Sequence, residues 1–134
     1  MARTQVFDVK TTTRNEMIDI TRLVRDAIRA SGVADGIVCV YCPHTTAGIT
    51  LQENTNPSVK RDLMTHLGVM VPKDGGYSHS EDNTDAHIKS SVVGASITLI
   101  VEGGRPLFGH WQAMFLCEFD GPRSRHVHVR AVPG

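Results

Sequence analysis

The segment Gly36-Ile37-Val38-Cys39-Val40-Tyr41-Cys42 is a nearly continuous apolar run that ends at Pro43 and His44. Since apolar runs bounded by glycine and proline are typical of strands buried on both faces, it predicts the central strand of a sheet. Cys39 and Cys42 lie three positions apart, so on a strand their side chains point to opposite faces. They could not hold one ligand together, and we interpret both as small buried hydrophobes.

Patterns on either side of this strand predict further strands and three helices. Period-two alternation and β-forming residues indicate strands over residues 4–12, 17–20, 45–53, 97–101, 107–119 and 125–130. Apolar residues at helical spacing indicate helices over residues 21–31, 57–69 and 84–93. Residues suited to cap the helix N-termini precede or open each one, namely Thr21, Asn56 before Pro57, and either Asn83 or Thr84.

The composition fits a single domain, residues 1–134, whose partner is a small molecule. Fourteen basic and fourteen acidic residues balance, which leaves no broad positive field for nucleic acid or an anionic membrane. No apolar run approaches the roughly 20 residues of a membrane span, and the N-terminus lacks the apolar core of a signal peptide. Three cysteines, an odd number, do not suggest a disulfide framework. We therefore expect a soluble, cytoplasmic protein.

Ligand-type side chains are concentrated in the stretch from Tyr77 to His87, which holds His79, His87 and three acidic residues. Close carboxylates repel one another and buried imidazoles need partners, so this density is costly unless something binds there. His44 follows the central strand, where the fold can bring it beside the first stretch. The sequence therefore predicts one site assembled from two segments.

Three histidines, His44, His79 and His87, would suffice for a zinc-like divalent metal. A catalytic zinc site uses about three protein ligands and keeps one position open for water or substrate. Nearby carboxylates could orient the imidazoles or act as a general base. The carboxylates that we assign to this role are Glu53, Glu81 and Asp85.

Two other interpretations of the histidines remain open. They can be separate surface residues, or the metal ligands can be His126 and His128, which share one face of the last strand. The alternation of that pair with valines fits an exposed strand face as well. His66 lies on the second helix, away from the others in sequence, and we interpret it as a surface or core residue.

Four blocks of the sequence carry a resemblance to a known family. They are His44-Thr45-Thr46-Ala47-Gly48-Ile49-Thr50, then Glu53-Asn54 with Asn56-Pro57, the block from His79 to Ser91, and Trp111-Gln112 with Cys117-Glu118-Phe119-Asp120-Gly121-Pro122-Arg123. Through them the chain resembles the YjbQ-like family, also labelled secondary thiamine-phosphate synthase, over nearly its whole length. Three positions depart from the family pattern: Asp82 replaces Gly, Thr84 replaces Ala and His110 replaces Thr. Asp82 and His110 are expected to add groups near the site.

The resemblance implies an α+β fold with a β-sandwich-like core of mixed sheet, about three helices and assembly as a homotrimer. Beside the three acidic residues above, it implies catalytic roles for Cys117, Glu118 and Asp120. A guanidinium suits bidentate phosphate recognition, which supports a substrate-binding role for Arg123. The other residues implied in substrate binding are Thr45, Thr46, Asn54, Asn83 and Lys89.

The family label implies that a pyrimidine diphosphate is joined to a thiazole phosphate with release of pyrophosphate. The expected partner is therefore a phosphorylated small molecule. Magnesium is the natural partner of a diphosphate, yet it prefers oxygen ligands, whereas three histidines favour a zinc-like ion. We consider three hypotheses: this transferase, a metal-assisted hydrolase, and a non-enzymatic trimer that binds a metal or small ligand.

Overall fold

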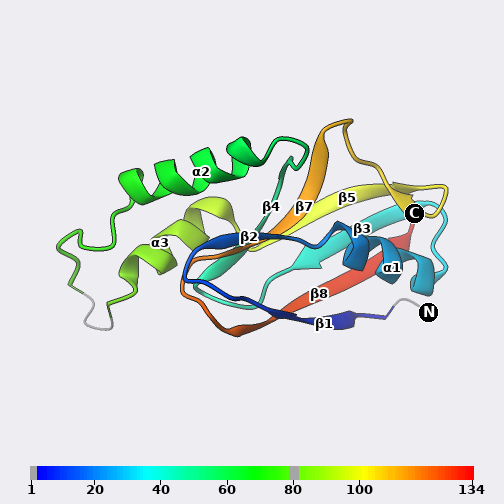
Figure 1. The fold of residues 1–134 in the computed structure, drawn as a ribbon. Helices are drawn as coiled ribbons and strands as arrows, with labels where there is room; N and C mark the ends of the chain where they lie inside the picture. Colours follow the sequence, from blue (N-terminus) through cyan, green and yellow to red (C-terminus); the bar gives the residue numbers. More distant parts are fainter. Residues whose placement is uncertain (1–2, 79–81) are drawn as a thin grey trace.

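The computed structural model describes residues 3–78 and 82–134, which form two β-sheets packed face to face and three helices (Figure 1). One sheet has the strand order β1 (Gln5–Lys10), β8 (Ser124–Pro133), β3 (Gly36–Tyr41), β5 (Ser96–Glu102) and β6 (Arg105–Pro106). The other has the order β2 (Glu16–Asp19), β7 (Gln112–Glu118) and β4 (Ala47–Glu53). The helices are α1 (Thr21–Ser31), α2 (Pro57–Met70) and α3 (Thr84–Val93). The α+β prediction is confirmed.

All strand pairs of the described residues are antiparallel, which corrects the expectation of a mixed sheet. Parallel neighbours need a crossover, usually a helix, that returns the chain to the same sheet. Here each helical connection changes sheet: α1 leads from β2 to β3, and α2 with α3 leads from β4 to β5. No helix that the structure describes is long and apolar enough to cross a membrane.

Two apolar clusters hold the layers together. The larger one fills the space between the inner face of the five-stranded sheet, the three-stranded sheet and α1, with Val38, Val127 and Leu116 fully buried. The smaller one lies on the other face of the three-stranded sheet, where Phe115 and Phe119 of the β7 segment pack beneath α2 and α3. Figure 1 shows these two helices together on one side of the molecule.

The helix caps agree only in part with the sequence pattern. Asn56 caps α2 as predicted, because its side chain accepts the Ser58 N–H at 3.0 Å with Pro57 in the first turn. Thr21 does not cap α1: Ile20 holds the cap position, and the buried Thr21 hydroxyl accepts the Met114 N–H at 3.0 Å. The Thr21 hydroxyl therefore accepts a hydrogen bond from β7 instead of from the first turn of α1, which is what the sequence pattern predicts.

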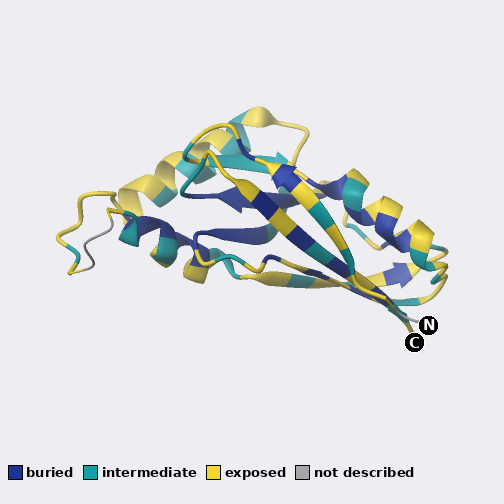
Figure 2. Cartoon of the chain, turned by 90° about the horizontal axis from the view of Figure 1, so that it is seen from below, coloured by how far each residue is buried: buried dark blue, intermediate teal, exposed yellow. Residues whose placement is uncertain are grey.

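Strand β3 is buried on one face only, which corrects the prediction that both faces are covered. Val38, Val40 and Cys42 point inward, whereas Cys39 is exposed and Tyr41 is 44% exposed. The burial colours of Figure 2 alternate along the strands in the same way. The difference arises because the second sheet and α1 cover only the inner face of this sheet within one chain.

Candidate functional site

Seven of the fifteen predicted site residues line one open pocket of about 370 Å³, which we call the β3–α3 pocket. It is formed where the chain leaves β3, where α3 begins, and where β7 connects to β8. Its lining includes the predicted residues His44, Thr45, Thr46, Asn83, His87, Asp120 and Arg123. Arg125, to which the sequence analysis gave no role, also lines it. The fold thus joins the two segments that were predicted to share a site.

His44 is held at the pocket by the last strand. Strand β3 ends at Tyr41, which pairs with His128 of β8, so the His126 backbone N–H has no β3 residue opposite it. This N–H donates to His44 Nε2 at 2.9 Å instead. Burial, with the positive charge of Arg125, lowers the pKa of His44. Because a neutral imidazole that accepts at Nε2 carries its proton on Nδ1, His44 has one tautomer here. The His126 ring stacks on it at 6.0 Å between centroids.

The predicted metal set is only partly represented in this geometry. His44 and His87 share the pocket, but Nε2 of His44 accepts from the His126 N–H and Nδ1 carries the proton, so His44 binds an ion only after its ring rearranges. His79 and Glu81 lie outside the described residues. Among residues 3–78 and 82–134, no group of three or more histidine, cysteine or acidic side chains is arranged to hold a metal. The metal site therefore stays a prediction.

Asp85 is a fully buried anchor of α3. Its two oxygens accept from Arg14 at 3.0 and 3.1 Å, and one also accepts from the Lys89 ammonium at 3.1 Å. Burial acts to raise the pKa of Asp85, but the hydrogen bonds from Arg14 and Lys89 outweigh it and lower the pKa to about 2. The Asp85 carboxylate is therefore bound by Arg14 and Lys89, and the Lys89 ammonium is bound by Asp85. These bonds suit a structural role for both residues rather than base catalysis or substrate binding.

Glu118 forms a second buried ion pair, between the two sheets. Its oxygens accept from Nε and Nη2 of Arg125, from the Thr11 hydroxyl at 2.8 Å, and from the backbone N–H groups of Phe119 and Asp120. Burial acts to raise the pKa of Glu118, yet these hydrogen bonds lower it overall. An ionised carboxylate with every oxygen engaged holds its neighbours in place and is a poor general base.

Asp120 connects two of the predicted substrate-binding residues. Its Oδ2 accepts from Asn83 Nδ2 at 2.9 Å and from Arg123 Nη2 at 3.0 Å, and its carbonyl accepts from Arg123 Nε. The N-cap residue Asn83 therefore bonds to the β7–β8 connection instead of capping α3 with its side chain. Its buried Oδ1 has no hydrogen-bond partner in the described part of the chain.

Cys117 does not line the β3–α3 pocket. It is fully buried in the cluster beneath α2 and α3, beside Phe115 and Phe119. Burial raises the pKa of its thiol to about 12. Since the thiolate is the nucleophilic form of cysteine, this thiol is unreactive near neutral pH.

Three other predicted residues lie at the opposite end of the three-stranded sheet. Glu53 ends β4, six residues or about 20 Å along the strand from Ala47 at the pocket end. Asn54 next to it donates to Asp19 at 2.5 Å. His110 lies two residues before Gln112, the register partner of Glu53, and is not among the residues that line the β3–α3 pocket. The linear sequence does not show which end of a strand each residue reaches.

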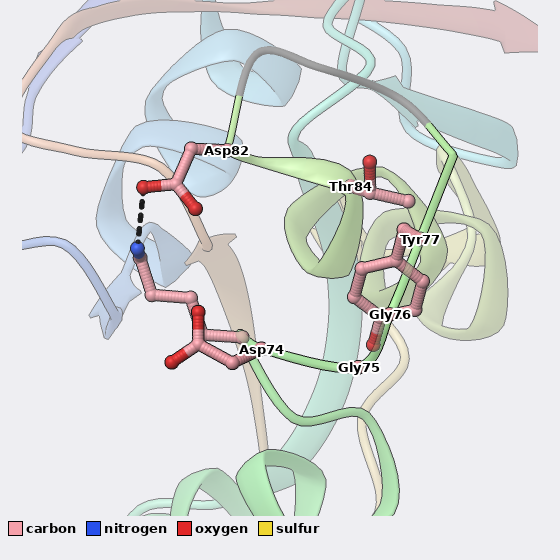
Figure 3. A pocket seen from close by; sticks show the side chains of 7 residues that line it. Asp74, Gly75, Gly76, Tyr77, Asp82 and Thr84 are labelled. Carbon is pink, nitrogen blue, oxygen red and sulfur yellow. Dashed lines mark hydrogen bonds and ion pairs between the residues drawn. The ribbon is translucent and has the colours of Figure 1, made fainter.

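A smaller pocket of about 260 Å³ lies beside the loop that precedes α3 (Figure 3). Across it Lys73 and Asp82 form an exposed ion pair of 2.7 Å. Asp82 has a φ of 61°, a left-handed conformation that glycine adopts at least cost and aspartate tolerates. The backbone at this position therefore suits the glycine that the family resemblance leads us to expect, and it also accepts Asp82.

Arg125 and Arg14 are the residues of this region that sequence reasoning did not assign. The role of Arg125 could have been found from the sequence, because it lies on the same, buried face of β8 as Val127 and Val129. A charged residue in a buried phase needs a partner of opposite charge. No local pattern marks Arg14, since its partner Asp85 lies 71 positions away.

Comparison with known proteins relates the chain to one protein family. The family model for the UPF0047 protein YjbQ-like matches residues 5–134. UPF0047 protein MJ1081 of Methanocaldococcus jannaschii is 50% identical over 126 residues, which cover 94% of this chain and 91% of that protein. UPF0047 protein YugU of Bacillus subtilis is 47% identical over 94% of this chain and 96% of its own length.

Solved structures of relatives have the same fold. A YjbQ/UPF0047 family protein from Clostridium acetobutylicum superposes with a TM-score of 0.94 at 47% identity, over 96% of this chain and 99% of that one. A protein of unknown function from Sulfolobus solfataricus gives a TM-score of 0.95 at 29% identity, over 100% and 99%. The sequence match and the shared architecture agree over nearly the full length. This chain therefore belongs to the UPF0047 family of YjbQ-like proteins.

Proposed function

We propose that the β3–α3 pocket binds the phosphate of a small molecule and that the protein is an enzyme acting on it. The observation that carries the proposal is the convergence of cationic and hydrogen-bond-donating groups, His44, Arg123 and Arg125, on one pocket. Guanidinium groups match the geometry of phosphate oxygens, and imidazole can donate to one. A pocket of about 370 Å³ suits a small metabolite.

Transfer or hydrolysis at a phosphate is the reaction class that we infer. In the transferase version, a pyrimidine diphosphate and a thiazole phosphate are joined and pyrophosphate leaves, and the pocket contributes positioning and charge stabilisation. The second version is hydrolysis of a phosphate ester. A divalent metal held by His44, His79 and His87 would stabilise charge on the departing group. Asp120 keeps Arg123 and Asn83 in place in either version.

Binding of pyrophosphate tests this proposal. We expect the wild-type protein to bind it in isothermal titration calorimetry, and Arg123→Gln to weaken binding about 10-fold, which corresponds to one charge-assisted hydrogen bond of about 1.5 kcal/mol. Arg29→Gln removes the same charge from an exposed face of α1 and should leave affinity unchanged. No binding by the wild type would refute the proposal, whereas binding without turnover of phosphorylated substrates would favour the non-enzymatic alternative.

We also propose that the protein assembles as a homotrimer through the outer face of the five-stranded sheet. This face exposes Val6, Ile37, Tyr41 and Ile100, each at 44% or more. Ile37 stands opposite Ile100 in the register, so these two apolar side chains are neighbours on this face, and exposed apolar surface of this kind marks interfaces. Light scattering at micromolar concentration should give three times the mass of the chain, and Ile37→Lys should lower it. A monomeric wild type would contradict the proposal.

A further inference from the structure

We infer that Arg125 is the fixed anion-binding residue of the β3–α3 pocket, and that Glu118 is its positioning residue. The inference rests on the proposed function, since it names the group that holds the phosphate. It goes beyond the sequence pattern, which pointed to Arg123. The ligand group is a terminal phosphate of a small molecule, bound by Nη1 of a guanidinium that the fold immobilises.

Three of the five guanidinium N–H groups of Arg125 are committed to the protein. Nε donates to Glu118 Oε1 at 2.8 Å, and Nη2 contacts Glu118 Oε2. Nη2 also donates to the hydroxyl and the carbonyl of Thr46, at 2.8 and 3.2 Å. The residue is only 3% exposed, so these contacts fix the plane of the group.

Nη1 is the part of the Arg125 guanidinium that the described residues leave available. It has no hydrogen-bond partner within residues 3–78 and 82–134. Among the fully buried side-chain nitrogen and oxygen atoms of these residues, only Asn83 Oδ1 lacks a partner, so Nη1 is not fully buried. Arg125 lines the pocket and Nη1 is its uncommitted edge, so we place Nη1 at the wall of that space. A buried cation with one donor edge open toward a pocket is a site prepared for an anion.

Rigid placement distinguishes Arg125 from Arg123. The Arg123 side chain is 52% exposed and, among the described residues, is held by Asp120 alone, whereas the Arg125 side chain is 4% exposed. Binding to Arg125 immobilises no further rotamers, and its low-dielectric surroundings strengthen each hydrogen bond. Because Glu118 already neutralises Arg125, the phosphate is attracted by directed N–H groups more than by net charge. We therefore expect affinity to fall only weakly with added salt.

Titration with inorganic phosphate tests the inference. The variants are Arg125→Lys, which keeps the charge beside Glu118 but removes the planar donor edge, Arg123→Lys, and Arg29→Lys as a distant control. We expect Arg125→Lys to weaken phosphate binding about 10- to 100-fold, the effect of one or two charge-assisted hydrogen bonds. Arg123→Lys should cost less, and Arg29→Lys nothing. Circular dichroism establishes that each variant is folded.

A measurement on the wild-type protein does not depend on any variant folding. Phosphate should shift the side-chain NMR signals of the Arg125 guanidinium and leave those of Arg14, bound to Asp85, unchanged. If phosphate binds, but neither the Arg125 signals nor the Arg125→Lys affinity changes, Arg125 is not the anchor and the proposed function survives. If the wild type binds neither phosphate nor pyrophosphate, the proposed function is refuted, and this inference with it.

Discussion

Replacement of Glu118 by alanine is expected to lower the free energy of unfolding by about 3–5 kcal/mol, the usual cost of removing one partner of a buried ion pair. The change leaves the Arg125 guanidinium buried between the sheets without its counter-charge. It also leaves the Thr11 hydroxyl without its carboxylate acceptor. Urea denaturation followed by circular dichroism measures the difference.

The matched control is Asp26→Ala, which breaks the ion pair with Arg29 on the surface of α1. Both side chains of that pair are more than half exposed, so we expect a change within about 0.5 kcal/mol. If Glu118→Ala costs no more than this control, the buried pair is not a main determinant of stability.

A double replacement separates stability from ligand binding. Apolar residues of similar volume can replace a buried ion pair with little loss of stability. We therefore expect Glu118→Met combined with Arg125→Met to be less destabilised than the sum of the two single variants. The same protein should lose phosphate affinity, because the Nη1 donor is gone. Coupling of this kind is the mark of residues that act as a pair.

Much of the local structure could be predicted from the sequence, although residues 107–111, predicted as strand, precede β7. Helical periodicity placed α1, α2 and α3 within a residue or two of their observed ends, and Pro57 and Gly32 marked boundaries correctly. The run at residues 36–42 correctly predicted a strand inside the sheet, between β8 and β5. Such signals are local, since they depend on the period of the side chains and on the backbone preferences of single residues.

The partners of the charged residues could not be read from the sequence in the same way. Asp85 was predicted to act at the site, yet its oxygens are bound by Arg14 and Lys89. Glu53 was grouped with the histidines, although β4 carries it to the far end of the sheet. Both outcomes depend on strand direction and register across two sheets, which no local pattern contains.

The second large effect that we expect is a loss of bound metal on replacement of His44, His79 or His87. If His44, His79 and His87 hold one metal, each single change to alanine should remove most of the bound metal, because two protein ligands compete poorly with water. Metal content would be measured by elemental analysis after dialysis against a mild chelator, with circular dichroism as a check on folding. Glu81→Gln should weaken binding about 10- to 100-fold if this carboxylate orients a ligand.

The structure makes the controls of this experiment sharper. His66 is exposed on α2, so His66→Ala should leave metal content unchanged. His126→Ala keeps the backbone N–H that His44 Nε2 accepts, but removes the stacked ring and its 2.6 Å contact with Asp8. We expect it to retain metal too. If the three proposed ligand variants keep full metal while His126→Ala loses it, the metal is held by the outer face of β8, and the β3–α3 pocket then binds its anion through arginine and imidazole N–H groups alone.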